Sequence, residues 1–330
     1  MYKEDKCRAE KYRDMLLEET ENFIIKMRED SVKKREEFIK NKNQDELRAE
    51  LKNMLGYPLC DYKKSEVVGN IELIDVDEYS EIYRVFVECL EGVHSYGLLF
   101  LPKNCEKSDL IIAMHGKEGT PEIASSFYDS CNYNDMVLRI RKRNTAVYIP
   151  QLLLWNERYG ACPDNEKMDV DLKQLGGSNA SLEAFKIMKT LDFIERNPRI
   201  NGNFGAIGMS YGGFYTLLLT ALDTRIRACM SSSFFNDRFI YNWNDWIWFN
   251  SGNKFLDSEL CMLIFPRPLY IAIGENDPTF RAKNSLKYVE KVEEIYTNSG
   301  KFVFEKFDGE HEFTKNDSGI EFVINEVKHA

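Results

Sequence analysis

Short apolar runs alternate with helical stretches over most of the chain, and this alternation restricts the possible folds more than any other feature. The runs, the last of which alternates in hydropathy, are 109–116, 145–151, 203–209, 225–232, 267–274 and 301–309. Helical patterns occupy the stretches between and after them, at 121–143, 179–197, 211–222, 281–298 and 316–329. Strands alternating with helices predict an α/β fold with a mostly parallel sheet and helices on both faces.

Three earlier segments have a different pattern. Residues 67–76, 81–90 and 94–102 are rich in β-branched and aromatic side chains and partly alternate in hydropathy. This is typical of antiparallel strands at the edge of a sheet. We therefore predict a mixed sheet whose first strands are antiparallel.

Residues 1–56 differ from the rest of the chain because they contain no proline and many charged side chains. Their apolar residues recur at roughly helical spacing, which predicts two amphipathic helices in an N-terminal helical extension. These apolar residues include Leu16, Phe23, Ile24, Met27, Phe38, Leu47, Leu51 and Leu55. The extension either packs on the main domain or serves as an arm that forms a homodimer.

The segment GAIGMSYGGF, residues 205–214, places a serine between glycines two residues before and two residues after it. A G-x-S-x-G match alone is weak, but this one follows an apolar strand and precedes an apolar helix. A strained turn in that setting exposes a serine hydroxyl near a helix N-terminus, which favours developing negative charge. The pattern predicts that Ser210 is a nucleophile.

A serine nucleophile needs a base and an acid that orients the base. Four histidines are present, and His311 follows the last predicted strand on a turn, whereas His329 is next to the chain end. Asp277 lies three residues beyond the strand that ends at Gly274, with Glu275 as its rival. The order serine, acid, histidine predicts Ser210, Asp277 and His311 as the catalytic set.

An oxyanion hole would use backbone N–H groups near the serine. The residue after the nucleophile, Tyr211, supplies one, and the loop that follows strand 109–116 supplies another. Within that loop we predict the N–H of Lys117, with Gly116 as the alternative. His115 is interpreted as a structural residue of the loop, because it precedes the serine in the chain.

The motifs HGKEG, GMSYGG, GENDPTF and DGEHEF occur in that order, and the chain resembles the α/β-hydrolase superfamily over residues 85–315. Within it, the sequence is similar to the bacterial dienelactone-hydrolase-like and acetyl xylan esterase-like branch. The resemblance implies that residues 57–330 form an α/β-hydrolase domain with serine esterase activity. It also implies the same catalytic triad and no metal or organic cofactor.

Two features depart from this branch. Dienelactone hydrolases proper use a cysteine nucleophile, whereas position 210 is serine. A tyrosine after the serine also resembles prolyl-oligopeptidase-like peptidases, which carry a β-propeller ahead of the hydrolase domain. The residues that precede the hydrolase pattern here are too few for a propeller. An aminopeptidase or amidase activity therefore remains as an alternative.

The tryptophans gather in two segments, near 151–177 and 233–262, where α/β-hydrolases commonly insert caps over the active site. Aromatic rings there suit a sugar face or an aromatic alcohol. We predict a substrate pocket lined by Trp155, Phe234, Trp243, Trp246 and Trp248. The alternative is that these rings only pack the caps onto the core.

Charge and composition restrict the partners. The net charge is −10 and no basic run carries interleaved aromatics, which argues against nucleic acid. The charged N-terminus and the lack of about 18 consecutive apolar residues predict a cytoplasmic protein with no membrane partner. Eight scattered cysteines without a CxxC pair indicate reduced thiols rather than a zinc site.

Together these features predict an enzyme that hydrolyses small esters, acetyl or other short acyl esters first, with acetylated carbohydrates among the candidates. No long apolar lid helix of lipase type is evident in the sequence. A different class of function is a catalytically idle hydrolase scaffold that serves as a binding protein. The intact serine, aspartate and histidine argue against that alternative.

Overall fold

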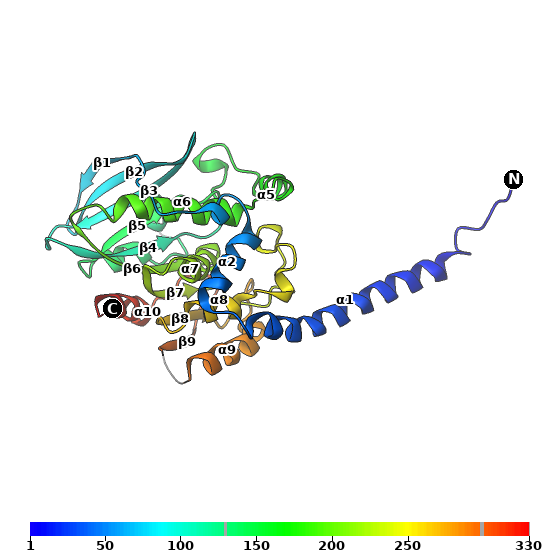
Figure 1. Cartoon of the computed structure of the whole chain (residues 1–330). Coiled ribbons are helices and arrows are strands. Elements are labelled where there is room, and N and C mark those ends of the chain that lie inside the picture. Colours follow the sequence, from blue (N-terminus) through cyan, green and yellow to red (C-terminus); the bar gives the residue numbers. More distant parts are fainter. Residues whose placement is uncertain (129–130, 298–299, 330) are drawn as a thin grey trace.

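A computed structural model describes residues 1–128, 131–297 and 300–329. Its centre is a sheet with the strand order β1-β2-β3-β5-β4-β6-β7-β8-β9 (Figure 1). The strands are β1 (Gly69–Val76), β2 (Ser80–Leu90), β3 (Val93–Pro102), β4 (Ser108–Met114), β5 (Ala146–Pro150), β6 (Ile200–Met209), β7 (Ile226–Ser232), β8 (Leu269–Gly274) and β9 (Phe302–Phe307). The pairs β1–β2, β2–β3 and β3–β5 are antiparallel and the other neighbours are parallel, which confirms the predicted mixed sheet.

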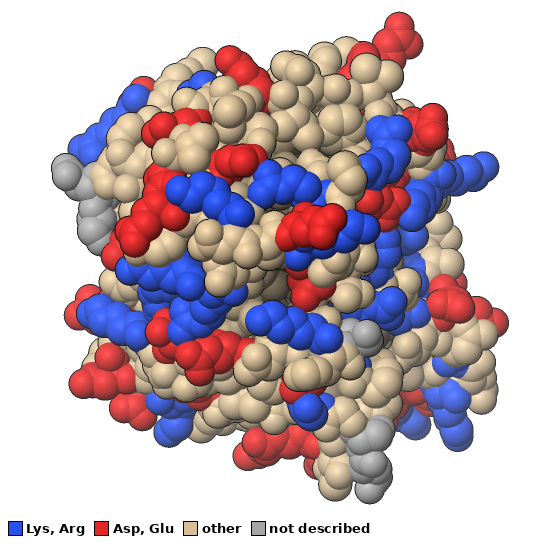
Figure 2. All heavy atoms as spheres, turned by 90° about the vertical axis from the view of Figure 1, so that its left-hand side faces the viewer, with Lys and Arg blue, Asp and Glu red and all other residues tan. Residues whose placement is uncertain are grey.

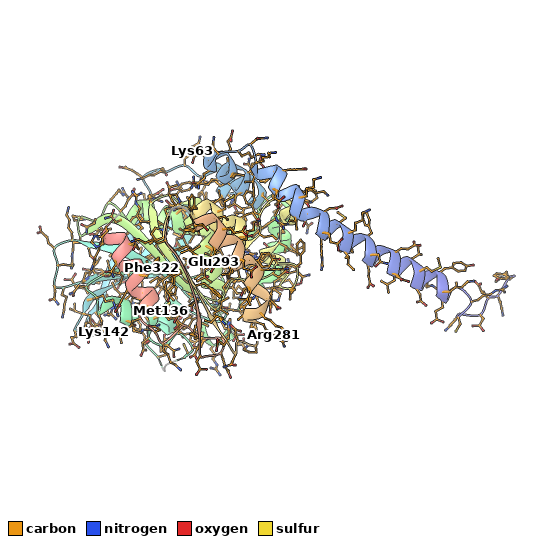
Figure 3. All side chains as sticks on the ribbon, turned by 90° about the horizontal axis from the view of Figure 1, so that it is seen from below. Lys63, Met136, Lys142, Arg281, Glu293 and Phe322 are labelled. Carbon is orange, nitrogen blue, oxygen red and sulfur yellow. The ribbon has the colours of Figure 1, made fainter. Side chains whose placement is uncertain are left out.

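Helices cover both faces of the sheet, and each face has its own apolar core. The helices that pack on one face are α2 (Gln44–Leu55), α6 (Asn179–Ile194), α7 (Tyr211–Leu222), α8 (Asp257–Ile264) and α9 (Ala282–Tyr296). Those on the other face are α3 (Pro121–Ala124), α4 (Met136–Arg141) and α10 (Ser318–Lys328). Figure 3 shows α9, marked by Arg281 and Glu293, on the opposite side of the strands from α10, marked by Phe322.

The parallel order of the strands decides where a site can form. The loops after β4, β6, β8 and β9 all leave the sheet at its carboxyl edge, because these strands run in the same direction. Ligands of open α/β sheets bind beyond this edge. The loops carry the predicted nucleophile, acid, base and oxyanion donors, so the topology brings distant parts of the chain together.

The N-terminal extension consists of α1 (Glu10–Ile39) and α2. Helix α2 buries Leu47, Leu51 and Leu55 against the sheet-covering helices, as its periodicity predicts. Helix α1 instead projects away from the body (Figure 1), and every residue from 10 to 30 is exposed. The interpretation that the whole extension packs on the main domain is therefore wrong for this part of α1.

The helical pattern of residues 121–143 predicts more helix than the structure contains. Only α3 and α4 are helical within it, and residues 129–130 lie outside the described residues. Ser126, Asn134 and Asp135 have positive φ angles of 60°, 46° and 55°. Serine, asparagine and aspartate form local hydrogen bonds that compete with a helix, and here the turn conformation prevails.

Two helices in the tryptophan-rich segments are not predicted by the sequence, namely α5 (Asn165–Gln174) and α8.

On the face of the molecule turned away from α1, Lys and Arg side chains are interspersed with Asp and Glu (Figure 2). No helix in the described part of the chain is long and apolar enough to cross a membrane.

Candidate active site

Ser210 sits on a strained turn between β6 and α7. Its φ and ψ angles are 56° and −122°, a conformation that a residue with a side chain rarely adopts. A Cβ on Gly208 would lie 2.2 Å from the carbonyl oxygen of Gly212, and one on Gly212 would lie 2.1 Å from that of Met114. The turn therefore has no room for a side chain at position 208 or 212, and the two glycines permit it, as the sequence pattern predicts.

Ser210, His311 and Asp277 form a hydrogen-bonded chain. The Oγ of Ser210 lies 2.9 Å from Nε2 of His311, and Nδ1 of His311 lies 2.8 Å from Oδ2 of Asp277. The Asp277 side chain is fully buried, whereas the His311 side chain is 24% exposed. In the neutral imidazole, Nδ1–H donates to the carboxylate and Nε2 is free to accept the serine proton.

The second oxygen of the Asp277 carboxylate fixes its orientation. Oδ1 accepts hydrogen bonds from the backbone N–H groups of Thr279 at 2.7 Å and Phe280 at 2.8 Å. The Phe280 ring also lies beside the His311 ring, with centroids 5.5 Å apart. The loop after β8 thus sets the position of both the acid and the base, and Glu275, the rival acid, is exposed.

The loop after β4 supplies the second candidate oxyanion donor. The N–H of Gly116 donates to the hydroxyl of Tyr133 at 2.8 Å, and the N–H of Glu118 donates to the Leu154 carbonyl at 2.6 Å. The N–H of Lys117 has no acceptor among the described residues. This favours Lys117 over Gly116 as the partner of Tyr211 in an oxyanion hole.

Tyr133 is a residue of the site that the sequence did not reveal. Its hydroxyl accepts the Gly116 N–H, and its side chain lines the cavity that contains Ser210 and His311. Complete burial holds the pKa of this phenol above its usual value. Tyr133 comes from the irregular segment between α3 and α4, and no motif marks it.

His115 is buried and holds the same loop in place. Its Nδ1 lies 2.9 Å from the Gly116 carbonyl oxygen, and its Nε2 accepts the N–H of Leu152 at 3.0 Å. Both contacts are satisfied by the neutral imidazole with its proton on Nδ1. Burial lowers the pKa of His115 to about 4.

This lowered pKa predicts a pH-dependent loss of stability. Between pH 6.5, the ordinary histidine value, and pH 4, the unfolded chain binds a proton at His115 that the folded chain does not. Stability therefore falls as the pH decreases through this window, by roughly 1.4 kcal/mol per pH unit at most.

Urea unfolding of the wild type and of His115→Gln at pH 7, 6 and 5 measures this contribution. We expect the variant to be less stable at pH 7, because one of the two loop contacts is lost, and to lose less stability on acidification. Equal pH slopes for the two proteins would contradict the assignment.

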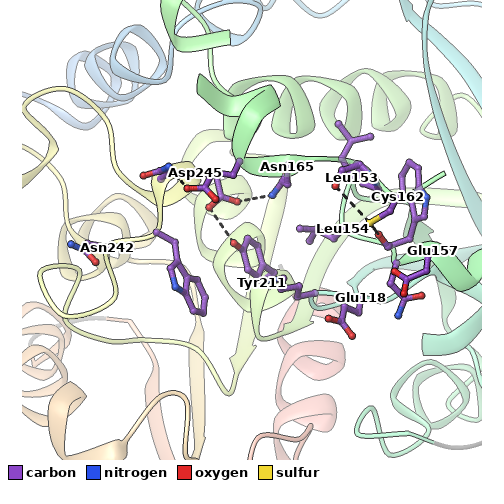
Figure 4. Close-up of a pocket in the computed structure, with 16 residues that line it drawn as sticks. Glu118, Leu153, Leu154, Glu157, Cys162, Asn165, Tyr211, Asn242 and Asp245 are labelled. Carbon is purple, nitrogen blue, oxygen red and sulfur yellow. Dashed lines mark hydrogen bonds between the residues drawn. The ribbon is translucent and has the colours of Figure 1, made fainter. Parts of the chain in front are cut away.

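A cavity of about 290 Å³ surrounds the reacting atoms and is lined by Ser210, His311, Tyr133 and Thr279, among others. A second cavity has a volume of about 470 Å³, and Figure 4 shows the residues that line it. Lys117, Tyr211 and Trp243 line both, so the two cavities are adjoining. We call them the inner and the outer cavity.

The outer cavity takes its walls from both tryptophan-rich segments, through residues 153–166 and 242–245. Its charged lining residues are Lys117, Glu118, Glu157, Glu166 and Asp245. Four carboxyl groups and one ammonium make it acidic. Burial raises the pKa of Asp245, which accepts hydrogen bonds from the Tyr211 hydroxyl at 3.1 Å and the Asn165 amide at 2.9 Å (Figure 4).

Two of the five aromatic residues predicted for the substrate pocket line these cavities. Trp155 lines the outer cavity, and Trp243 lines both and stacks on Tyr211 with an interplanar angle of 3°. Phe234, Trp246 and Trp248 line neither and belong to the core packing around Phe214. For these three, the alternative interpretation applies: their rings hold the cap segment on the core.

Within residues 1–128, 131–297 and 300–329, no three His, Cys, Asp or Glu side chains are grouped so that they could hold a metal ion. The cysteines there are free, and Cys89, Cys229 and Cys261 are buried.

Several solved structures with a similar fold are esterases, each at low sequence identity to this chain. A glucuronoyl esterase from Solibacter usitatus has a TM-score of 0.64 and 13% identity, and the match covers 87% of this chain and 92% of that chain. Acetyl xylan esterase 1 from Thermoanaerobacterium sp. has a TM-score of 0.60 and 14% identity, with 86% and 94% covered. An acetyl xylan esterase from Paenibacillus sp. has a TM-score of 0.57 and 14% identity, with 82% and 88% covered.

These likenesses confirm the predicted α/β-hydrolase fold. No family model matches the sequence, and no curated protein matches it.

Proposed function

We propose that this protein is a serine hydrolase that cleaves small carboxylic esters through an acyl-enzyme. The observation that carries the proposal is the hydrogen-bonded chain from Ser210 through His311 to Asp277 at the wall of a cavity. Nucleophile and base within hydrogen-bond reach, with the base oriented by a third group, are the signature of nucleophilic catalysis. The esterases of similar fold add support for ester substrates.

In the proposed mechanism, Nε2 of His311 takes the proton of Ser210 as Oγ attacks the ester carbonyl. Asp277 stabilises the imidazolium that forms. The N–H groups of Tyr211 and Lys117 bind the developing oxyanion, and His311 then protonates the leaving alcohol. Water, activated by the same histidine, hydrolyses the acyl-enzyme and restores the serine.

Two features favour short acyl groups and a neutral alcohol. The inner cavity is small, at about 290 Å³, and Tyr133, Met209 and Thr279 close around Ser210. The acidic outer cavity disfavours an anionic leaving group, because like charges repel strongly where solvent is partly excluded. The half-buried ring of Trp155 and the exposed ring of Trp243 line the outer cavity and suit a sugar, so acetylated carbohydrates are candidate substrates.

The first test compares p-nitrophenyl acetate, butyrate and octanoate with an aminoacyl p-nitroanilide. We expect kcat/KM to fall steeply with acyl length and the anilide to be cleaved slowly or not at all. Cleavage of the anilide alone would replace the esterase proposal with the aminopeptidase or amidase alternative. Lack of labelling by a fluorophosphonate, together with no turnover of any substrate, would favour the idle scaffold.

A further inference from the structure

The projecting part of α1, residues 10–30, which we call the arm, presents apolar side chains to solvent. All of its residues are exposed. The exposed large apolar side chains of α1 are Tyr12, Met15, Leu16, Leu17, Phe23, Ile24, Ile25, Met27 and Val32. Helices in proteins draw most of their stability from packing of an apolar face, and contiguous exposed apolar side chains mark interaction sites.

Five of these side chains lie on one face of the arm. At 100° per residue, they fall within an arc of about 120°, which we call the seam. The seam consists of Leu16, Leu17, Phe23, Ile24 and Met27. Farther along, the same face meets the body, because Ser31 and Arg35 are buried there and Arg35 contacts Gly252 and Glu259. The arm therefore continues a packing face beyond the edge of the body.

We propose that the seam binds the seam of a second copy of this chain, with the two helices antiparallel. In the register that places Thr20 opposite Phe23 of the second copy, Leu16 faces Met27 and Leu17 packs beside Ile24. Leu16, Thr20, Phe23 and Met27 follow the alternating four- and three-residue spacing of paired helices. A two-fold axis near residues 21 and 22 relates the copies, so every contact occurs twice.

Charge complementarity selects this partner and this direction. Residues 12–21 carry four acidic side chains and one basic one, whereas residues 22–31 carry two basic and two acidic ones. In the antiparallel register, Arg13 faces Asp30 of the second copy, and Glu19 lies diagonally across from Lys26 at the flank of the seam. A parallel pair would place Arg13 opposite Arg13 and Asp30 opposite Asp30, which is repulsive.

The pairing also fits the length of the arm. The register brings Tyr12 opposite Ser31, the first residue of α1 that the body covers. Helix α1 begins two residues before Tyr12, at Glu10. The contact therefore spans residues 12–31, about 30 Å of helix, and ends where the body of the second copy begins.

Sedimentation equilibrium of the full chain tests the proposal. We expect a dimer for the wild type and a monomer for Leu16→Glu/Phe23→Glu, because two charges per helix enter the seam. The matched control Met15→Glu/Ile25→Glu adds the same charges outside the seam and should remain a dimer. A monomeric wild type at 100 µM, or a dimer that persists in the seam variant, would overturn the proposal.

Charge reversal tests the direction. Arg13→Glu and Asp30→Arg should each raise the dissociation constant about tenfold or more, and the double variant should restore it. The two positions are about 25 Å apart in one helix, so no contact within a chain can produce the rescue. Failure of the rescue would overturn the antiparallel pair. Circular dichroism and ester hydrolysis verify folding, since the arm lies outside the active site.

Discussion

Replacement of Ser210 by alanine is expected to lower kcat for p-nitrophenyl acetate by about 10⁴-fold or more. The hydroxyl is the only group of the residue that reacts, and it lies 2.9 Å from Nε2 of His311. Without it, water would have to attack the ester directly and no acyl-enzyme could form. The fold should survive, because alanine has the same Cβ at the strained φ of 56°.

The matched control is Ser232→Ala. Ser232 is also buried and lies at the end of the neighbouring strand β7, and its carbonyl accepts the N–H of Ser210. Its own hydroxyl has no hydrogen-bond partner in the part of the chain that the structure describes. Its removal should therefore leave kcat within a few-fold. Equal activity of Ser210→Ala and the wild type would refute the proposed nucleophile.

Replacement of Asp277 by asparagine is expected to lower kcat by roughly 10³- to 10⁴-fold. Oδ1 accepts two backbone N–H groups, so an asparagine would keep its oxygen there and turn its NH₂ toward His311. Nδ1 of His311 would then have to accept, and its proton would move to Nε2. A protonated Nε2 cannot take the proton of Ser210, although all heavy atoms stay in place.

Asp308→Asn provides the comparison for this variant. Asp308 is exposed and lies on the loop after β9, close to His311 in the chain, but the ring nitrogens of His311 bond to Asp277 and Ser210 instead. It should keep near wild-type kcat. Thermal unfolding of both variants separates a loss of chemistry from a loss of fold, and a small effect of Asp277→Asn on kcat would remove Asp277 from the mechanism.

The sheet and the grouping of Ser210, Asp277 and His311 could be predicted because their signals are local or follow chain order. Each strand of the sheet is a short apolar or alternating run, and a serine elbow needs glycines at fixed spacing. Two histidines follow Ser210 in the chain. His329 is next to the chain end, whereas His311 lies on a turn directly after a strand, so His311 is the better candidate base.

The substrate side could not be predicted in the same way. An aromatic side chain in a cap has the same local pattern whether it faces a cavity or the core, and only the packing of distant elements decides. Trp243 lines both cavities, whereas Trp246, three residues later, is 1% exposed and packs on Phe214. The position of Tyr133 in the site, and the exposure of residues 10–30 of α1, likewise follow from which distant segments pack together, and no local pattern reveals that.

Tyr211 links the two cavities through its two ends. Its N–H belongs to the proposed oxyanion hole, while its hydroxyl is held by Asp245 and its ring by Trp243 in the outer wall. A leaving group that contacts this wall would therefore touch the same residue whose N–H we propose as an oxyanion donor. Contacts made far from the scissile bond can then contribute to the rate of the chemical step as well as to substrate affinity.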